Sequence, residues 1–317
     1  MRTLITGVTG FIGNALARRL LDLGHDVYGL VRFTSNPARI PEGVKVVHAD
    51  LTDYHSVEMA VRVVRPEVVF HLAALTPVSL SFDQPEAYIE TNFLGTVRLL
   101  EALRKHSRES LQLFALAGTT EMYDTSEPID EHTPFSPKSP YAVSKVAAVR
   151  YAKYMHAVYG MPVVIVVPCN TYGRANVGQR HFVIEKVITS MLEGKKRIVM
   201  GNPDAKRDFM FREDHVNAYL SVMRAILDEE RENLLGGLFV FGTGKAHSIL
   251  EVFEICREIT GWDGEVLWNA YIRPYDQPVI VTNPRRAMLK LGWKPKYDLN
   301  SGLRRAVREW KERLGVA

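Results

Sequence analysis

The sequence lacks several features that would place a protein in a special class. It has only two cysteines in 317 residues, Cys169 and Cys256, too few and too far apart for a disulfide framework or a cysteine-based zinc site. The first residues, MRTLITG, lack the long apolar core of a signal peptide, and no apolar run approaches membrane-spanning length. We therefore expect a cytoplasmic protein with neither a membrane span nor a metal site.

Blocks of lysine and arginine are missing too. The 40 basic and 36 acidic side chains leave a net charge of only +4. A surface of mixed sign explains this better than a nucleic-acid footprint, although a small basic excess also suits an anionic small molecule. Repeats and low-complexity tracts are absent, and the length predicts one large domain or two coupled ones.

Short apolar runs alternate with amphipathic patterns in the first half of the chain. This alternation predicts right-handed strand-helix-strand crossovers and therefore an α/β fold with a Rossmann-type, doubly wound parallel sheet. The expected strands are 3–6, 26–31, 44–48, 67–73, 111–117 and 162–167. The expected helices are 11–23, 54–64, 87–105 and 140–159.

After about Cys169 the pattern loosens. Helices are expected at 181–194, 213–227, 249–260 and 301–314, with short strands and loops between them. We interpret residues 169–317 as a smaller α/β substrate domain, some segments of which cross back to the first sheet. It is expected to pack over the carboxyl edge of the sheet of residues 1–168, where ligands bind in open α/β folds.

The segment TGVTGFIG places three glycines at the first strand-to-helix turn. Gly7, Gly10 and Gly13 permit a tight turn, close approach of a phosphate, and tight packing of the helix on the sheet. The free N–H groups of the first helical turn, which includes Phe11 and Ile12, then meet a pyrophosphate. Residues 1–168 are therefore predicted to bind a dinucleotide.

The end of the second strand favours NADP as that dinucleotide. NAD-preferring sites usually offer a carboxylate to the 2′-hydroxyl of the ribose, but this chain has Val31 and then Arg32. A guanidinium suits a 2′-phosphate, whereas an Arg32 that simply faces solvent would leave NAD as the alternative. Asp50, near the end of the third strand, is expected to accept a hydrogen bond from the adenine amino group.

A tyrosine and a lysine stand four residues apart in SPYAVSK. Tyr141 and Lys145 therefore share one helical face, and an ammonium near a phenol favours the phenolate, which is a usable base near neutral pH. Thr119, which follows the strand LQLFALA, is expected to hydrogen-bond the same substrate hydroxyl.

Taken together, TGVTGFIG, FHLAA, ETNFLGT and YAVSK resemble the extended short-chain dehydrogenase/reductases that act on nucleotide sugars. The resemblance implies that Tyr141 takes the proton of the sugar 4-hydroxyl while the C4 hydride passes to the nicotinamide. It implies that Lys145 also holds the nicotinamide ribose and that Asn92 supports the site. It also implies a homodimer in which two chains pair through the helix 140–159 and the long helix before it. The remaining cofactor contacts that it implies are Leu51, Leu72, Ala73 and Ala74.

The second half carries matching motifs for a sugar nucleotide. Asn170 in CNTYG resembles the asparagine that hydrogen-bonds the substrate diphosphate. Arg207 in KRDFMF and Arg273 in RPYDQ resemble the arginines that clamp it, and Asp276 resembles the residue that contacts the nucleotide ribose. Guanidinium groups suit phosphate oxygens, so the chemistry agrees with the resemblance.

Glu121 lies in GTTEMYD, where a buried strand ends and a carboxylate is costly unless it is paired or has a function. The segment resembles that of sugar-nucleotide 4,6-dehydratases, in which the glutamate removes the C5 proton and the C6 hydroxyl leaves as water. Thr120 would then lie near the departing hydroxyl. NPDAKRDF and LGWKPK resemble the GDP-mannose 4,6-dehydratases in particular, so a GDP-sugar is the favoured substrate.

Other interpretations of the chain stay open. A sugar-nucleotide 4-epimerase and a GDP-4-keto-6-deoxymannose reductase share the scaffold, and Glu121 argues against a plain epimerase more firmly than it selects a dehydratase. Glu121 that only caps or pairs near a loop is a further alternative. A non-catalytic dinucleotide-binding module is disfavoured, because the chain keeps both Tyr141 and Lys145.

Overall fold

The computed structural model describes residues 1–174, 182–228, 233–270 and 275–316. The chain forms two compact units that are interleaved along the sequence. Unit 1 comprises residues 1–124, 134–167 and 216–239, and unit 2 comprises residues 125–133, 168–215 and 240–317.

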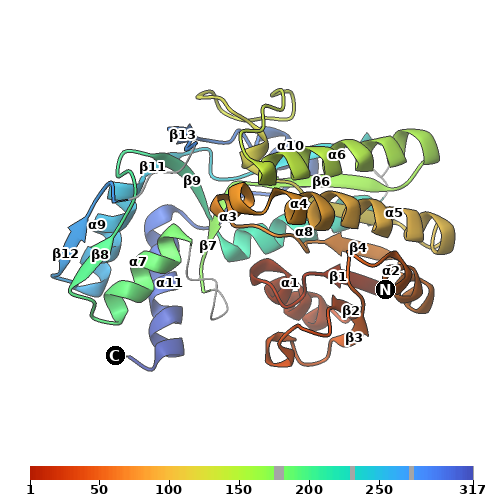
Figure 1. Ribbon diagram of the computed structural model, residues 1–317, viewed down its shortest axis with the longest axis horizontal. Helices are drawn as coiled ribbons and strands as arrows, with labels where there is room; N and C mark the ends of the chain where they lie inside the picture. Colours follow the sequence, from red (N-terminus) through yellow and green to blue (C-terminus); the bar gives the residue numbers. More distant parts are fainter. Residues whose placement is uncertain (175–181, 229–232, 271–274, 317) are drawn as a thin grey trace. The chain divides into compact units, whose positions relative to one another are not determined.

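The large sheet has the strand order β10-β6-β5-β4-β1-β2-β3. Figure 1 labels β6, β4, β1, β2 and β3 of this sheet. Neighbouring strands from β6 to β3 pair in parallel, which confirms the predicted fold class. The strands are β1 (Arg2–Thr6), β2 (Asp26–Val31), β3 (Lys45–His48), β4 (Val68–His71), β5 (Leu113–Ala117), β6 (Val163–Pro168) and β10 (Leu238–Phe241). The central strands are apolar on both faces because helices cover both faces of such a sheet.

The helices of the large sheet are α1 (Phe11–Asp22), α2 (Tyr54–Val64), α5 (Gly95–His106), α6 (Pro140–Tyr159) and α8 (Arg212–Leu227). Right-handed crossovers place α1 on the face opposite α5 and α6, since β1 to β2 and β4 to β5 run in opposite directions across the sheet. On the second face α2, α5 and α6 pack side by side (Figure 1). Helix α6 starts where Ser139 Oγ accepts from Ala142 N–H at 3.1 Å and ends at Gly160, whose φ is +66°.

The predicted helix 87–105 is helical throughout but not regular. It consists of α4 (Pro85–Tyr88), a π-helical segment η2 (Ile89–Leu94) and α5. The N–H of Gly95 bonds the carbonyl of Glu90, five residues back, which is the π-helical pattern. Three short elements complete the described part of unit 1: η1 (Pro37–Arg39), α3 (Val78–Asp83) and η3 (Thr120–Met122).

Unit 2 contains two small sheets. One has the order β11 (Ala246–Ser248), β9 (Lys206–Phe211), β13 (Val279–Ile280), with β7 (Asn170–Tyr172) also paired to β9; the other joins β12 (Glu265–Leu267) to β8 (Arg197–Val199). Its helices are α7 (Val183–Leu192), α9 (Ile249–Thr260), α10 (Arg285–Leu291) and α11 (Leu299–Leu314). The buried carboxylate of Asp208 on β9 accepts hydrogen bonds from Thr243, Gly244 and Thr282, so it ties the loop after β10 and the residues after β13 to this sheet.

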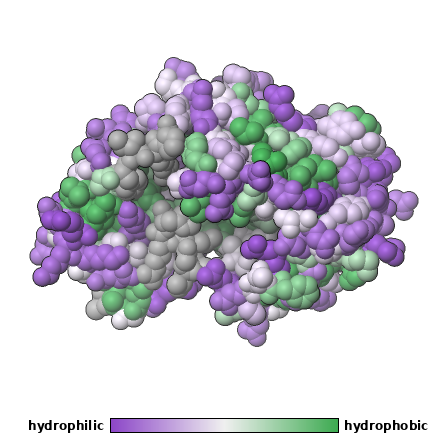
Figure 2. All heavy atoms as spheres, viewed as in Figure 1, coloured by the Kyte–Doolittle hydropathy of each residue, from purple (hydrophilic) through white to green (hydrophobic). Residues whose placement is uncertain are grey.

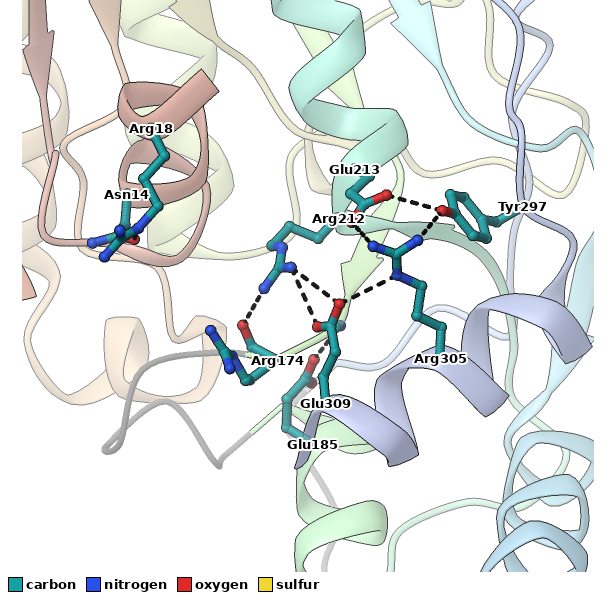
Figure 3. A network of polar contacts seen from close by, with 10 residues as sticks. Asn14, Arg18, Arg174, Glu185, Arg212, Glu213, Tyr297, Arg305 and Glu309 are labelled. Carbon is teal, nitrogen blue, oxygen red and sulfur yellow. Dashed lines mark hydrogen bonds and ion pairs between the residues drawn. The ribbon is translucent and has the colours of Figure 1, made fainter. Parts of the chain in front are cut away.

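A charged network within unit 2 joins α11 to the start of α8 (Figure 3). Arg305 on α11 donates to Glu213 at 2.6 Å and to the hydroxyl of Tyr297 at 2.6 Å. Glu309, one turn further along α11, accepts from Arg305 at 3.3 Å and from Arg212 at 3.2 Å. Arg305 thus shares its guanidinium among three partners, and this linked, partly buried network is a stronger brace than isolated surface pairs.

Hydrophilic side chains predominate on the face drawn in Figure 2, and the apolar ones form small separate groups. Among the residues that the structure describes, no helix has both the length and the apolar character needed to cross a bilayer. The same residues contain no group of histidine, cysteine and acidic side chains that could hold a metal ion.

Candidate active site

The glycine turn between β1 and α1 has no room for side chains. Gly7 has φ +74°, and a Cβ there would lie 2.8 Å from the backbone nitrogen of Ala73. A Cβ on Gly13 would overlap the carbonyl oxygen of Gly7. Gly10 starts α1 without a side-chain cap, and the first turn of the helix has no acidic residue. Free N–H groups at a bare, uncharged helix start fit a pyrophosphate.

The other residues predicted to contact the cofactor lie either in the first turn of α1 or directly after β4. Phe11 and Ile12 form the first turn of α1, and Leu72, Ala73 and Ala74 follow β4, the strand paired with β1. Leu72 and Ala73 each donate a backbone hydrogen bond to Thr6 Oγ1, at 3.1 and 3.0 Å.

The predicted adenosine contacts follow β2 and β3. Val31 is buried at the end of β2, and Arg32 after it is exposed. Asp50 and Leu51 follow β3, where Asp50 Oδ1 accepts from the N–H of Thr52 at 2.9 Å. The end of β2 is therefore followed by an exposed guanidinium and then by Phe33, without an acidic side chain at either position.

Tyr141 and Lys145 lie in the first two turns of α6 and are both buried. Burial raises the pKa of the Tyr141 phenol; a hydrogen bond with Thr119 lowers it and the negative charge of Glu121 raises it further. Burial also lowers the pKa of Lys145 to about 8. The sequence predicted a lowered pKa for Tyr141, whereas in the protein alone the pKa is raised, because desolvation outweighs the hydrogen bond with Thr119. Added positive charge beside the phenol is needed to make it a base near neutral pH.

Thr119, Thr120 and Glu121 form the turn after β5. Thr119 caps the 3₁₀ segment η3, its Oγ1 accepting from the N–H of Glu121 at 3.3 Å. Thr120 is buried, whereas Glu121 is half-buried. Thr119 and Glu121 both act on the phenol of Tyr141, so the turn brings hydroxyl groups and a carboxylate to the same place as the tyrosine. Such a set can exchange protons with a bound hydroxyl and with a nearby acidic C–H group.

Asn92 lies in the π-helical segment η2 and is buried. Its side chain accepts from Leu75 N–H at 2.8 Å and donates to the Leu75 carbonyl at 3.0 Å. It also donates to Ser144 Oγ at 3.0 Å, and Ser144 in turn donates to the Tyr141 carbonyl at 2.7 Å. Asn92 therefore braces the first turns of α6, where Tyr141 and Lys145 stand.

The predicted substrate residues belong to unit 2. Asn170 lies on β7, and its buried Oδ1 has no hydrogen-bond partner among the described residues. Arg207 on β9 is almost buried and pairs with Asp276 at 2.6 Å. Arg273 lies outside the described residues. Within unit 2 the structure thus brings together two of the four residues, Arg207 and Asp276.

In unit 1, two residues close to Asn92 and the first turns of α6 were given no role from the sequence. Ser144 stands between Tyr141 and Lys145, and His71 lies in the FHLAA segment, between Thr6 and Thr96. A lone serine or histidine in an apolar setting gives no sequence signal, so only the hydrogen-bond pattern reveals them.

Comparison with known proteins agrees with this geometry. The sequence model of the family described as GDP-mannose 4,6 dehydratase matches residues 4–306. The chain belongs to this family. Among curated relatives, GDP-mannose 4,6 dehydratase 2 of Arabidopsis thaliana is 31% identical over 332 residues, covering 96% of this chain and 86% of the relative.

Solved structures of sugar-nucleotide epimerases are similar to this chain as well. The UDP-glucose 4-epimerase of Thermus thermophilus, in complex with NAD, has a TM-score of 0.88 and 31% identity, covering 98% of this chain and 99% of that one. The UDP-glucose 4-epimerase of Thermotoga maritima, with UDP-glucose, has a TM-score of 0.89 and 27% identity, covering 99% of this chain and 100% of that one. The protein is therefore an extended short-chain dehydrogenase/reductase and an enzyme of the sugar-nucleotide epimerase/dehydratase group.

Proposed function

We propose that the protein is a sugar-nucleotide 4,6-dehydratase that uses NADP and acts on a GDP-sugar. The observation that carries the proposal is the position of Glu121. It lies on the same short turn as Thr119, close enough to Tyr141 for its negative charge to raise the pKa of the phenol. A 4-epimerase needs one base at the 4-hydroxyl, whereas water elimination needs a second base at C5. The match of the family model over residues 4–306 supports the same activity.

The glycine turn and its surroundings would hold the dinucleotide. Gly7, Gly10 and Gly13 fit the pyrophosphate by the spacing described above. Arg32 would hold a 2′-phosphate and Asp50 the adenine; NAD is the alternative, which the Thermus epimerase complex supports. When bound, the cofactor supplies a hydride acceptor for the sugar C4 that returns the hydride at C6.

The side chains of the turn and of α6 would carry the proton transfers. Tyr141 Oη takes the proton of the 4-hydroxyl, which Thr119 holds by a second hydrogen bond. The Lys145 ammonium stabilises the phenolate and holds the nicotinamide ribose. The resulting 4-ketone acidifies the C5–H bond, and Glu121 would take that proton and pass it to the C6 hydroxyl, which leaves as water beside Thr120. The proton that Tyr141 took from the 4-hydroxyl would return at C5 as C6 is reduced, so that one water is lost overall. The first step depends on the positive charge of Lys145, because burial raises the pKa of the Tyr141 phenol.

The substrate diphosphate and ribose are assigned to unit 2. Arg207 and Arg273 would bind the diphosphate, Asn170 would donate to it, and Asp276 would contact the ribose. Asp276 keeps Arg207 oriented meanwhile, because a guanidinium fork bound on one side is pre-set for phosphate on the other. The division into cofactor binding by residues 1–168 and sugar-nucleotide binding by residues 169–317 belongs to the same proposal, as do a cytoplasmic location and a homodimer.

A 4-epimerase is the second candidate, because the Thermus epimerase is as similar in sequence as the Arabidopsis dehydratase. The two activities differ by one water molecule. Incubating the protein with GDP-mannose, dTDP-glucose and UDP-glucose in the presence of NADP or NAD, and weighing the products, separates them. We expect a product lighter by one water from GDP-mannose, whereas an isomer of unchanged mass would indicate an epimerase. A separate incubation with NADPH and a GDP-4-keto-6-deoxy sugar tests for a 4-keto reductase, which would consume NADPH stoichiometrically.

Replacing Glu121 tests its assigned role. We expect Glu121→Gln to reduce water elimination by at least about a hundredfold, because the C5 proton loses its base. Deuterium uptake at C5 from heavy water should fall equally, while dinucleotide binding stays unchanged. Glu127→Gln, a change at an exposed carboxylate on the following loop, is the matched control and should keep full activity. Undiminished C5 exchange in Glu121→Gln rules out the assignment, and Tyr141→Phe should abolish both exchange and elimination.

A further inference from the structure

A buried histidine connects the glycine-turn strand to the segment that braces the catalytic helix. His71, the last residue of β4, is fully enclosed, and Phe114 packs against its ring. Its Nδ1 lies 2.7 Å from Thr6 Oγ1, and its Nε2 lies 2.9 Å from Thr96 Oγ1. Both ring nitrogens are therefore used, one toward β1 and one toward α5.

The partners of the two threonines determine where the imidazole proton lies. Thr6 Oγ1 already accepts the N–H groups of Leu72 and Ala73, so its own proton is given to His71 Nδ1. Thr96 donates its proton to the Asn92 carbonyl at 2.7 Å, so its oxygen accepts from His71 Nε2–H. The hydrogen bonds thus fit one neutral tautomer, with the proton on Nε2. Burial, reinforced by the charge of Lys145, lowers the pKa of His71 to about 3, which keeps the ring neutral.

The carbonyl that Thr96 satisfies belongs to the π-helical segment. In η2 the N–H of Gly95 bonds Glu90, five residues back. The hydroxyl of Thr96 supplies a donor to the Asn92 carbonyl from within the next turn. The side chain of Asn92 separately bonds Leu75 and Ser144, as described above. The orientation of Asn92 is consequently held at both ends, by its carbonyl and by its amide.

We propose that His71 is a positioning residue, which as an Nε2-protonated neutral imidazole fixes Asn92 and, through Asn92, the first turns of α6. The relay runs from β1 through β4, α5 and η2 to α6, so it joins the strand before the glycine turn to the helix of Tyr141. It touches no substrate atom. Its effect on turnover rests on the proposed function, whereas the tautomer does not.

The kinetic test uses the hydroxyl of Thr96. Thr96→Val keeps the shape but removes the acceptor for His71 and the donor to Asn92, and Thr96→Ser restores both. We expect Thr96→Val to lower kcat on the order of tenfold with KM for the sugar nucleotide within twofold, and Thr96→Ser to recover most of kcat. Thr189→Val is the matched control, because Thr189 on α7 makes the same kind of bond, to the Glu185 carbonyl at 2.8 Å, in unit 2. The proposal is overturned if Thr189→Val lowers kcat as much as Thr96→Val does. It is also overturned if Thr96→Val leaves kcat unchanged.

The second test observes the ring directly. Nitrogen-15 resonance of histidine-labelled protein, with the His71 signal identified by its loss in His71→Gln, should show a protonated Nε2 and an unprotonated Nδ1. The pattern should stay constant from pH 8 to pH 5. A proton on Nδ1, or titration within this range, overturns the proposal. If the wild-type protein converts no sugar nucleotide, the proposed function fails, and the ring spectrum alone then decides the assignment of His71.

Discussion

At the scale of single residues, the glycine turn leaves the least freedom. The Cβ position on Gly13 falls far inside van der Waals contact with the Gly7 carbonyl oxygen, so even alanine would force backbone apart at the start of α1. The same backbone N–H groups are those proposed to face the pyrophosphate. Steric fit and binding are therefore coupled at this position.

We expect Gly13→Ala to weaken dinucleotide binding by at least about tenfold, because the displaced α1 start no longer presents its N–H groups together. Titration with NADPH, followed by its fluorescence, measures the change. The matched control is Gly160→Ala at the end of α6, where a Cβ meets no atom within 4 Å but φ is +66°. It should cost about 1 kcal/mol of stability and leave the dissociation constant unchanged, so equal weakening in both variants would contradict the assignment.

Motifs with fixed spacing were predictable from the sequence at this scale, but energetics was not. The glycine triad and the tyrosine-lysine pair each lie where the strand-helix pattern predicts them. The direction of the Tyr141 pKa was wrong for the protein alone, because it depends on burial, which no spacing reports. His71 and Ser144 went unassigned because only their hydrogen bonds in the folded chain reveal them.

At the scale of elements, the strands and helices of the first half follow the sequence pattern closely. Helix α6 spans the predicted residues 140–159, and each predicted strand of this half overlaps an observed one. The π-helical segment had no signal, because no proline marks the interruption and the bonds of the Asn92 side chain to Leu75 within it are not visible in the sequence. Strand β10 was given no range, although segments crossing back to the first sheet were expected, because LFVF lies among short, loosely patterned segments.

Helix α6 also presents an outward apolar stripe. Val143, Tyr154 and Val158 are 45, 44 and 59% exposed and lie near one line along the helix, at spacings of 11 and 4 residues, with the exposed Arg150 on the same line between Val143 and Tyr154. We expect this stripe to pair with that of a second chain, as the proposed homodimer requires. Val158→Lys should shift the mass measured by analytical ultracentrifugation toward the monomer. Leu289→Lys, at a residue 72% exposed on α10, is the control and should leave the mass unchanged; a wild-type monomer refutes the dimer.

At the scale of the whole molecule, buried ionisable groups predict how stability depends on pH. Burial lowers the pKa values of His71 in unit 1 and of His215 in unit 2 to about 3. The unfolded chain therefore binds these protons first, and stability is complete above about pH 6.5 and is lost as the pH falls below it. For each histidine, the free energy of unfolding is expected to fall by about 2 kcal/mol between pH 7 and pH 5. Thermal unfolding should show the melting temperature falling over that interval.

Glu185 on α7 is expected to change stability with pH in the opposite direction, so it provides an independent test of the same reasoning. Burial raises its pKa to about 7, so the folded state binds this proton more readily than the unfolded chain, and stability falls as the pH rises from about 4.5 to 7. Glu185→Gln should therefore be more stable than the wild type by about 3 kcal/mol at pH 8 and by less than about 1 kcal/mol at pH 5, as measured by thermal unfolding. An equal difference at both pH values would contradict the buried, proton-binding carboxyl.

The interleaving of the two units bears on how the protein is made. Unit 1 is completed by residues 216–239, which are synthesised only after residues 168–215 of unit 2. A ribosome must therefore release roughly three quarters of the 317 residues before the large sheet gains its last edge strand. Until then the nascent sheet exposes an unpaired β6, the kind of edge on which chaperones act and newly made chains aggregate.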